Sequence, residues 1–160
     1  MSQKLKIERT DEPGTTRLVL KGIIDEDADF DAAFADVKPT VVVNLEGIEM
    51  INSCGVREWV HAIQAFPKTA RVVYEKLAPR IVEQVNYVAN FLGHGKVTSF
   101  YAPYFCPKCK KEANVLLSVE AMARASSVKA PTEKCPACKG TMEFDDIEEE
   151  YFSFLENVAS

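Results

Sequence analysis

Along most of the chain, short apolar runs alternate with segments in which apolar residues recur every three or four positions. The runs are rich in β-branched residues or alternate with period two, and they predict strands. The predicted strands are residues 4–9, 17–24, 40–45, 71–74 and 96–101. The segments with helical spacing are residues 30–37, 56–63 and 79–92. Strands that alternate with helices of this length predict an α/β fold with right-handed crossovers.

Turn and capping residues bound the predicted helices. The acidic residues 25–27 precede the first helix, where negative charge favours a helix N-terminus, and Pro39 follows it. Pro79 opens the third helix and Gly93 ends it. Trp59 falls on the apolar stripe of the second helix, so we expect this side chain in the core.

The last part of the chain predicts one more helix, over residues 146–159. Apolar residues recur there at helical spacing after an acidic first turn. Such a helix needs a core to cover, and residues 102–145 are too few to supply one. We therefore expect three parts: an α/β domain over residues 1–101, an insertion over residues 102–145, and a helix over residues 146–160 that returns to the α/β domain.

Four of the five cysteines form two Cys-Pro-x-Cys-Lys motifs in the predicted insertion. They are Cys106, Cys109, Cys135 and Cys138. Two residues between cysteines allow a tight turn to direct both sulfurs at one ion, and two such turns complete the thiolate tetrahedron that Zn²⁺ accepts. Neighbouring lysines offset the negative charge of the four thiolates, and Gly140 after the second pair permits a left-handed backbone.

Two other interpretations of the cysteines are two disulfides and a redox pair. Disulfides require an oxidising compartment, and a redox motif has no need to occur twice with matching turns. A structural zinc site explains both motifs together. Four protein ligands leave no open position for water, so we expect zinc to stabilise the insertion as a zinc ribbon rather than to catalyse a reaction.

Composition and charge narrow the class of protein. The chain has 160 residues, of which 47% are hydrophobic and 27% charged, which is typical of a globular protein and excludes a collagen or a disordered tail. No apolar run approaches the ~20 residues that span a bilayer, and the first residues lack the apolar core of a secretion signal. We therefore expect a cytoplasmic protein without a membrane partner.

The net charge of −5 is unevenly distributed, because residues 102–145 are slightly basic and the remainder is strongly acidic. Compensation of the zinc thiolates explains this excess of lysine, and a nucleic-acid surface on the insertion is the alternative. The two histidines, His61 and His94, have no nucleophile or carboxylate at triad spacing, and no phosphate-binding glycine motif is present. The sequence thus predicts a protein that is not an enzyme.

Residues 41–56 resemble the signature of STAS domains, the fold of bacterial anti-sigma-factor antagonists. In that family a hydrophobic strand ending in Asn-Leu or Asp-Leu leads to Asp-Ser-Ser-Gly or Asp-Ser-Thr-Gly at the start of a helix. This chain has Asn44-Leu45 and then Asn52-Ser53-Cys54-Gly55. Residues 20–25 resemble the family's Leu-x-Gly-x-Ile/Leu-Asp strand. The similarity covers residues 5–101 and 146–158, and the insertion is unlike the basic family pattern.

The resemblance implies a regulatory protein whose partner is an anti-sigma kinase or another STAS-associated protein. In antagonist members the serine at the position of Ser53 is phosphorylated by that kinase. The partner surface would comprise Asn52, Ser53, Cys54, Gly55 and Arg57. This chain departs from the pattern, because Asn52 replaces an aspartate and Cys54 replaces a serine or threonine.

Two alternatives remain open at this helix start and in the insertion. Asn52 or Ser53 could serve only as a helix cap, a contribution of roughly 1 kcal/mol. We expect Cys54 to be a small buried contact rather than a reactive thiol. The second functional hypothesis is a nucleic-acid-binding or scaffold protein that acts through the zinc ribbon.

Overall fold

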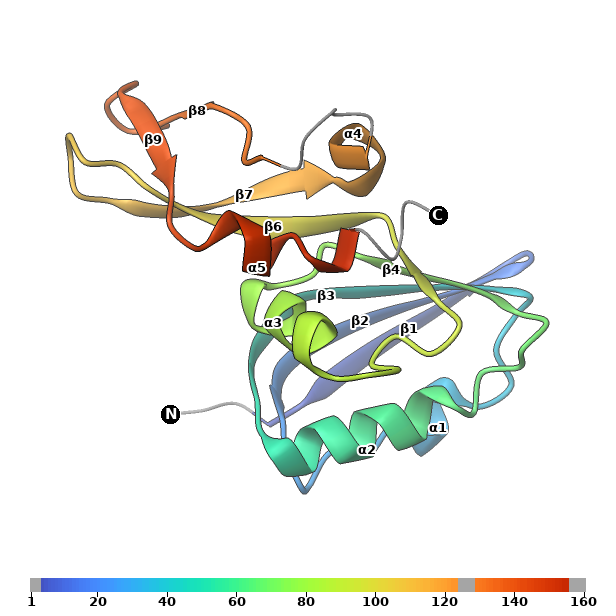
Figure 1. Cartoon of the computed structure of the whole chain (residues 1–160). Helices are drawn as coiled ribbons and strands as arrows, with labels where there is room; N and C mark the ends of the chain where they lie inside the picture. Colours follow the sequence, from blue (N-terminus) through green and yellow to red (C-terminus); the bar gives the residue numbers. More distant parts are fainter. Residues whose placement is uncertain (1–3, 124–128, 156–160) are drawn as a thin grey trace.

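The computed structural model describes residues 4–123 and 129–155 and contains two β-sheets (Figure 1). The first sheet has the order β1-β2-β3-β4-β5, with β1 antiparallel to β2 and the other neighbours parallel. Its strands are β1 (Lys6–Glu12), β2 (Thr15–Ile24), β3 (Thr40–Ile51), β4 (Arg71–Glu75) and β5 (Lys96–Val97). The predicted α/β fold class is confirmed, because helices connect the parallel strands.

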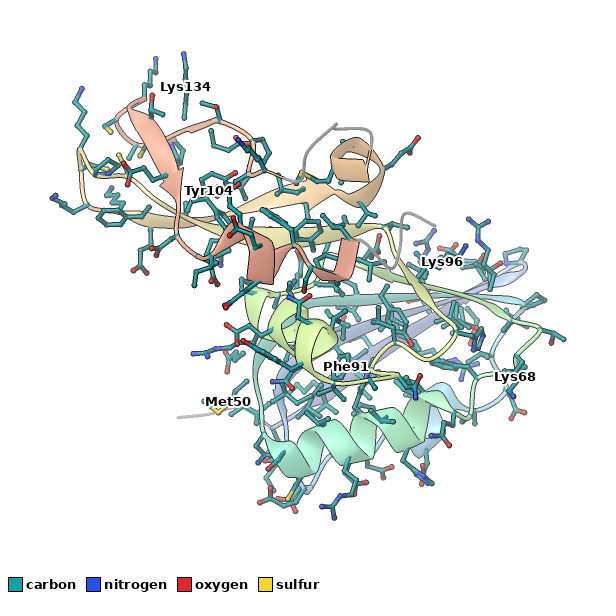
Figure 2. All side chains as sticks on the ribbon, in the orientation of Figure 1. Met50, Lys68, Phe91, Lys96, Tyr104 and Lys134 are labelled. Atoms are coloured by element: carbon teal, nitrogen blue, oxygen red, sulfur yellow. The ribbon has the colours of Figure 1, made fainter. Side chains whose placement is uncertain are left out.

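Three helices lie between the strands of the first sheet. They are α1 (Asp31–Phe34), α2 (Ser53–Ile63) and α3 (Pro79–Tyr87). Helices α1 and α2 lie along one face of the sheet (Figure 1), and Trp59 of α2 is fully buried there, as predicted. Its ring stacks on Phe91 with centroids 5.7 Å apart, and its Nε1 donates a hydrogen bond to the Phe91 carbonyl at 2.8 Å. Phe91, labelled in Figure 2, thus fixes the segment after α3 against α2.

The strand β3 is longer than the sequence predicted. We expected a loop after residue 45, but β3 continues to Ile51 and pairs with β2 to its end. Register shifts between Val19 and Lys21 and between Gly22 and Ile23 of β2 accommodate extra residues of β3. Such bulges break the strict period of two, so the apolar pattern no longer has the appearance of a strand.

The helices α1 and α3 are shorter than predicted. Helix α1 is a single turn that begins at Asp31, and its N-cap residue Phe30 makes no side-chain cap bond. The expected acidic cap over residues 25–27 is therefore wrong. The carboxylate of Asp25 instead accepts from the backbone N–H of Asp27 at 2.9 Å, which closes a local turn. Helix α3 ends at Tyr87, and turns continue to Gly93, whose φ is +59°.

The second sheet has the order β7-β6-β9-β8 and carries the four clustered cysteines. Its elements are β6 (Ser99–Phe105), β7 (Glu112–Ser118), the short helix α4 (Val119–Ala123), β8 (Glu133–Lys134) and β9 (Thr141–Phe144). The strand predicted over residues 96–101 is divided at Thr98, with β5 in the first sheet and β6 in the second. The buried residues Val97 and Phe100 lie three positions apart, so the period of two is interrupted at Thr98 and Ser99, where the strand divides.

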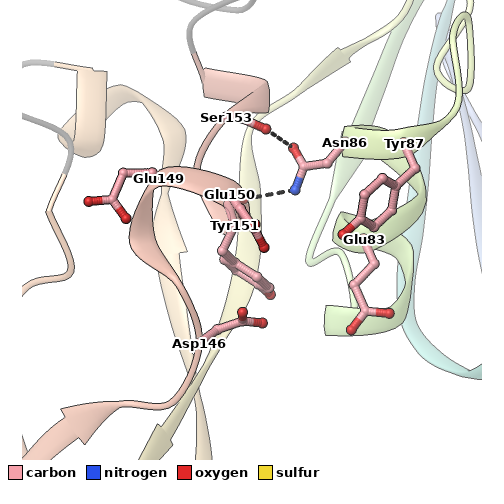
Figure 3. Close-up of a pocket in the computed structure, with 8 residues that line it drawn as sticks. All are labelled: Glu83, Asn86, Tyr87, Asp146, Glu149, Glu150, Tyr151 and Ser153. Atoms are coloured by element: carbon pink, nitrogen blue, oxygen red, sulfur yellow. Dashed lines mark hydrogen bonds between the residues drawn. The ribbon is translucent and has the colours of Figure 1, made fainter.

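The C-terminal segment contacts α3 and the base of the second sheet. Helix α5 (Glu148–Tyr151) is a single turn, so the predicted long helix is wrong in length, and residues 156–160 lie outside the described residues. Figure 3 shows the side chain of Asn86, from α3, bonded to this segment. Its Nδ2 donates to the Tyr151 carbonyl at 3.0 Å, and its Oδ1 accepts from Ser153 Oγ and from the Phe154 N–H at 2.9 Å each.

Aromatic rings bury the remaining surface of this contact. Phe100 of β6 lies edge-on to Phe152 and Phe154, with centroids 6.0 Å and 5.1 Å away. Phe152 and Phe154 are both buried. The C-terminal segment therefore joins the two sheets through an apolar contact at the start of β6.

Candidate functional site

The start of α2 is held in place by Asn52. As the N-cap residue, Asn52 accepts a hydrogen bond from the Gly55 N–H at its Oδ1, at 2.7 Å, which satisfies one free donor of the helix. Its own backbone N–H donates to the Ile24 carbonyl at 3.2 Å. Asn52 therefore ties the helix start to the end of β2, and the capping alternative applies to Asn52 rather than Ser53.

Gly55 fits a space in which no side chain could be placed. A Cβ atom at this position would lie 2.0 Å from the carbonyl oxygen of Ile24. The backbone of α2 thus approaches the end of β2 directly, and Gly55 is buried. Together, Gly55 and Asn52 set the direction in which the first turn of α2 leaves the sheet.

The other residues of this turn are exposed. Ser53, Cys54 and Arg57 all lie on the surface, so the expectation that Cys54 is a buried contact is wrong. The first turn packs on the sheet through the Gly55 backbone, which leaves the side chains on either side of it in solvent. Met50, at the end of β3, is 52% exposed close to the same turn (Figure 2).

Acidic residues border the helix start. The Nδ2 of Asn52 donates to Glu26 Oε2 at 3.2 Å. The pKa of Glu26 lies below its usual value, first because its own backbone N–H bonds the carboxylate and second because Asn52 does so. Carboxylate oxygens of Asp25, Glu26 and Asp27 lie within 4.8 Å of one another. A negative charge added at Ser53 would therefore lie next to a residue, Asn52, that already contacts a carboxylate.

The four cysteines of the second sheet converge on one point. Their sulfur atoms all lie within 4.8 Å of one another, with Cys106 3.5 Å from Cys138 and Cys109 3.5 Å from Cys135. A tetrahedral ion with metal–sulfur bonds of about 2.3 Å requires sulfurs about 3.8 Å apart. The geometry thus fits one tetrahedral ion, and the structure brings together all four predicted ligands.

Two turns of matching shape supply the cysteines. Lys110 N–H donates to the Cys106 carbonyl and Lys139 N–H to the Cys135 carbonyl, each at 2.8 Å. The residue after each second cysteine has a left-handed backbone, with φ of 65° at Lys110 and 61° at Lys139. The expectation that Gly140 would take this conformation is therefore wrong. Gly140 instead leaves space for Cys138, whose Sγ would lie 3.3 Å from an added Cβ atom.

Backbone donors favour the thiolate form of the first cysteine in each turn. The pKa of Cys135 falls to about 6, because the N–H groups of Cys138 and Ala137 are directed at its sulfur. The pKa of Cys106 is lowered in the same way, first by the N–H of Cys109. Cys109 behaves differently: the Lys111 N–H lowers its pKa, but burial and the neighbouring thiols outweigh it and raise the value to about 11. Four ionised thiols at this spacing repel one another, and a cation removes the repulsion.

Lysines flank the four cysteines in the sequence at the tip of the second sheet. Each of them is exposed, and Lys134 is labelled in Figure 2. They are Lys108, Lys110, Lys111, Lys134 and Lys139. The tip of the sheet therefore combines a candidate metal centre with a positively charged surface.

Clefts also mark the surface away from these two sites. One of about 550 Å³ lies between α3 and α5 and is lined by acidic residues, including Glu83, Asp146 and Glu150 (Figure 3). The sequence did not predict it, because its two sides are distant in the chain. His61 and His94 are exposed, and His94 Nε2 lies 3.0 Å from the Ala70 carbonyl. Within residues 4–123 and 129–155, no helix has both the length and the apolar character needed to cross a bilayer.

Two residues of the α2 site were missed from the sequence. Glu26 contacts the N-cap and Met50 is exposed beside it, yet neither lies in the matched Asn-Ser-Cys-Gly motif. Glu26 and Asn52 are 26 residues apart in the chain, so the contact between them depends on the fold. The exposure of Met50 depends on the unexpected length of β3.

Comparison with known proteins gives one partial similarity. No family model matches the chain, and no curated protein matches it. Among solved structures, the chain is similar to the crystal structure of an anti-sigma factor antagonist from Mycobacterium paratuberculosis. The identity is 21%, the match covers 47% of this chain and 71% of that chain, and the TM-score is 0.39.

Proposed function

We propose that this chain is a non-enzymatic regulatory protein that binds a protein partner through the start of α2. The observation that carries the proposal is the exposure of Ser53, Cys54 and Arg57 on a turn that Asn52 and Gly55 hold rigidly. These three side chains take no part in fixing the helix. The matching motif of STAS domains presents its serine at the same place, which supports a partner of the kind that anti-sigma-factor antagonists bind.

Met50 adds an apolar contact to this surface. A side chain that is 52% exposed beside a serine, a cysteine and an arginine resembles the apolar centre and polar rim of a protein interface. Glu26 borders the surface on the side of β2. The surface would therefore suit a partner that offers an apolar pocket together with groups that complement Arg57.

Phosphorylation of Ser53 is the proposed switch. A phosphate adds a charge of about −1.5 to −2 at neutral pH, and free N–H donors at the start of a helix favour it. The same charge would repel Glu26, whose carboxylate bonds Asn52. Phosphorylation would thus weaken the contact between the acidic loop and α2, and it would change the surface offered to the partner.

We further propose that the four cysteines bind Zn²⁺ and that the metal has a structural role. The tetrahedral sulfur set also fits iron, but Zn²⁺ is the usual ion of paired Cys-x-x-Cys turns. Cys106, Cys109, Cys135 and Cys138 would hold it, and with four protein ligands it would supply folding free energy. Metal analysis of the purified chain distinguishes the two ions, since one zinc per chain is expected and bound iron would contradict the assignment.

Site-specific photo-crosslinking in the native host tests the partner surface. A photo-reactive residue at Arg57 should capture a specific protein, whereas the same residue at Lys68, exposed and distant from α2's start (Figure 2), should not. Ser53→Asp should reduce the capture at position 57 at least tenfold, and Ser53→Ala should preserve it. Equal capture at both positions would contradict the proposed surface.

Intact-mass measurement tests the switch separately. Chain purified from its native host should carry one phosphate, which is lost in Ser53→Ala. If the crosslink at position 57 responds to Ser53→Asp but no phosphate is found under any growth condition, the surface stands and the switch does not.

The lysines around the cysteine cluster favour a second candidate function, nucleic-acid binding through the second sheet. Five exposed lysines stand next to the cysteines in the sequence. Binding of this kind falls steeply with salt, because lysines displace counterions from phosphates. Retention on DNA or RNA at low salt that is lost on replacing Lys108, Lys110 and Lys111 would support it, and no retention at low salt would exclude it.

A further inference from the structure

The strand β7 forms an open edge of the second sheet. The order β7-β6-β9-β8 places it at a border (Figure 1). Its neighbour β6 separates it from the first sheet, because the opposite edge of β6 bonds to Leu77: Leu77 N–H donates to the Ser99 carbonyl and Tyr101 N–H to the Leu77 carbonyl. In the described part of the chain, no segment pairs with the outer edge of β7.

The hydrogen bonds at both ends of the β6–β7 ladder show which backbone groups face outward. Cys106 N–H donates to the Lys111 carbonyl at 2.9 Å, and Val119 N–H donates to the Thr98 carbonyl at 3.0 Å. Hydrogen-bonded and non-hydrogen-bonded pairs alternate along an antiparallel ladder, so these two bonds identify the hydrogen-bonded pairs between them. The backbone groups that face β6 belong to Ala113, Val115 and Leu117. Those that face outward belong to Glu112, Asn114, Leu116 and Ser118, and all four residues are exposed.

The edge of β7 lacks the features that protect other edges. Residues 113–119 carry no charge, and Leu116 is 46% exposed. By contrast, β1 at the border of the first sheet is charged at most of its positions, and β5 and β8 have only two residues each. Charge and short length prevent edge-to-edge pairing, so β7 is the edge at which such pairing is favoured.

We propose that β7 pairs with β7 of a second copy of this chain, antiparallel about a two-fold axis at Val115. In this register Glu112 lies opposite Ser118 and Asn114 opposite Leu116, so every outward N–H meets an outward carbonyl. No like charges face each other, and the central pair, Val115 with its copy, is apolar. The strand is thus its own complement, as an isologous interface requires, and one continuous sheet runs through both copies.

Two substitutions on β7 test the pairing. Asn114→Pro removes one outward N–H but no bond to β6, and Leu116→Lys introduces a charge of the kind that protects edges. Tyr87→Lys, which changes a 77% exposed side chain on α3, is the matched control. Analytical ultracentrifugation of the metal-loaded full chain, from about 1 to 100 μM, measures the mass.

Wild type and Tyr87→Lys should form dimers with the same dissociation constant, and both β7 variants should weaken dimerisation at least tenfold. Unchanged metal content and circular dichroism show that a variant is folded. If Asn114→Pro does not fold, Leu116→Lys alone tests the pairing. A monomeric wild type at 100 μM would overturn the proposal, as would dimers of both variants that match wild type.

Cysteine crosslinking tests the register itself. At a two-fold axis the Cα atoms of a non-hydrogen-bonded pair lie about 4.5 Å apart, within the range that a disulfide spans. Val115→Cys should therefore crosslink two copies on oxidation, whereas Ala113→Cys, which faces Leu117 of the other copy, should not. Crosslinking of Ala113→Cys without that of Val115→Cys would contradict this register.

Discussion

The first and second sheets bury different kinds of side chain. In the first, parallel strands and helices enclose side chains such as Leu20, Val43 and Trp59, each fully buried. In the second, the buried residues near the tip include Cys106 and Cys135, and the interior is the sulfur cluster itself. A segment with too few residues for an apolar core can hold its strands with a metal ion, whereas a sheet covered by helices has no need of one.

The strand β6 packs in an apolar environment at its start and leads to the cysteine cluster at its end. At its start, Phe100 lies fully buried among the aromatic rings of the C-terminal segment. At its end, the chain passes directly into Cys106. We therefore expect the base of the second sheet to depend on apolar packing and its tip to depend on the metal.

Loss of a metal ligand should have the largest effect. Cys106→Ser removes one of four thiolates, and metal binding in isolated zinc modules contributes on the order of 10 kcal/mol of folding free energy. Native mass spectrometry should show the metal lost and the tip unfolded. Cys54→Ser, which alters the exposed cysteine at α2, should retain one ion per chain. Equal metal content in the two variants would show that the cluster is not a metal site.

Truncation of the central aromatic residue should affect the other region. Trp59→Ala creates a cavity in the core and removes the bond to the Phe91 carbonyl, which should lower the free energy of unfolding by about 3–5 kcal/mol. Denaturant unfolding followed by circular dichroism measures the loss. The metal content should remain one ion per chain. Release of the metal from folded Trp59→Ala would mean that the two regions are not separately stabilised.

The substitution Gly55→Ala should displace the candidate partner surface at the start of α2. The new Cβ would lie 2.0 Å from the Ile24 carbonyl oxygen, so α2 must shift, at a cost of about 1–3 kcal/mol. Ser53→Ala, two residues away on the exposed side, should change stability by no more than about 0.5 kcal/mol. Unfolding curves of the two variants measure the contrast, and similar curves would show that the close approach does not constrain the helix.

The smallest expected effect concerns the cap of α2. Asn52→Ala removes the bond to the Gly55 N–H, a loss of about 1 kcal/mol. It also removes a donor that lowers the pKa of Glu26, so that pKa should rise toward its usual value. A carboxyl with a lowered pKa adds stability above its unfolded pKa and loses it as pH falls through the folded pKa.

The difference in the free energy of unfolding between wild type and Asn52→Ala should therefore become smaller at acid pH. It should not vanish, because the hydrogen bond to the Gly55 N–H does not depend on pH. An NMR titration of Glu26 and unfolding curves at neutral and acid pH measure both parts. An unchanged Glu26 pKa in the variant would rule out the contact with Asn52.

The sequence predicted local features better than those set by distant residues. The starts of α2 and α3 and the four clustered cysteines followed from caps, spacing and turn residues. The length of β3 did not, because bulges opposite β2 disturb its alternation. The sheet that each half of residues 96–101 joins was not predicted, because it depends on which strand that half pairs with.

The exposure of Cys54 shows the same limit at a single residue. The sequence is enough to place Cys54 in the motif, but the exposure of its side chain depends on how closely Gly55 approaches Ile24. The acidic cleft between α3 and α5 likewise forms from segments far apart in the chain. Contacts between segments this far apart in the chain can be identified only once the fold is known.

Hydrogen exchange of the full chain, with and without a strong metal chelator, tests most directly whether the two sheets are stabilised separately. Removal of the metal should abolish protection of amides around the four cysteines and in β8 and β9, while amides of β2, β3 and α2 keep theirs. Uniform loss of protection across both sheets, or no loss at the cysteines, would contradict a metal-held tip on an apolar body.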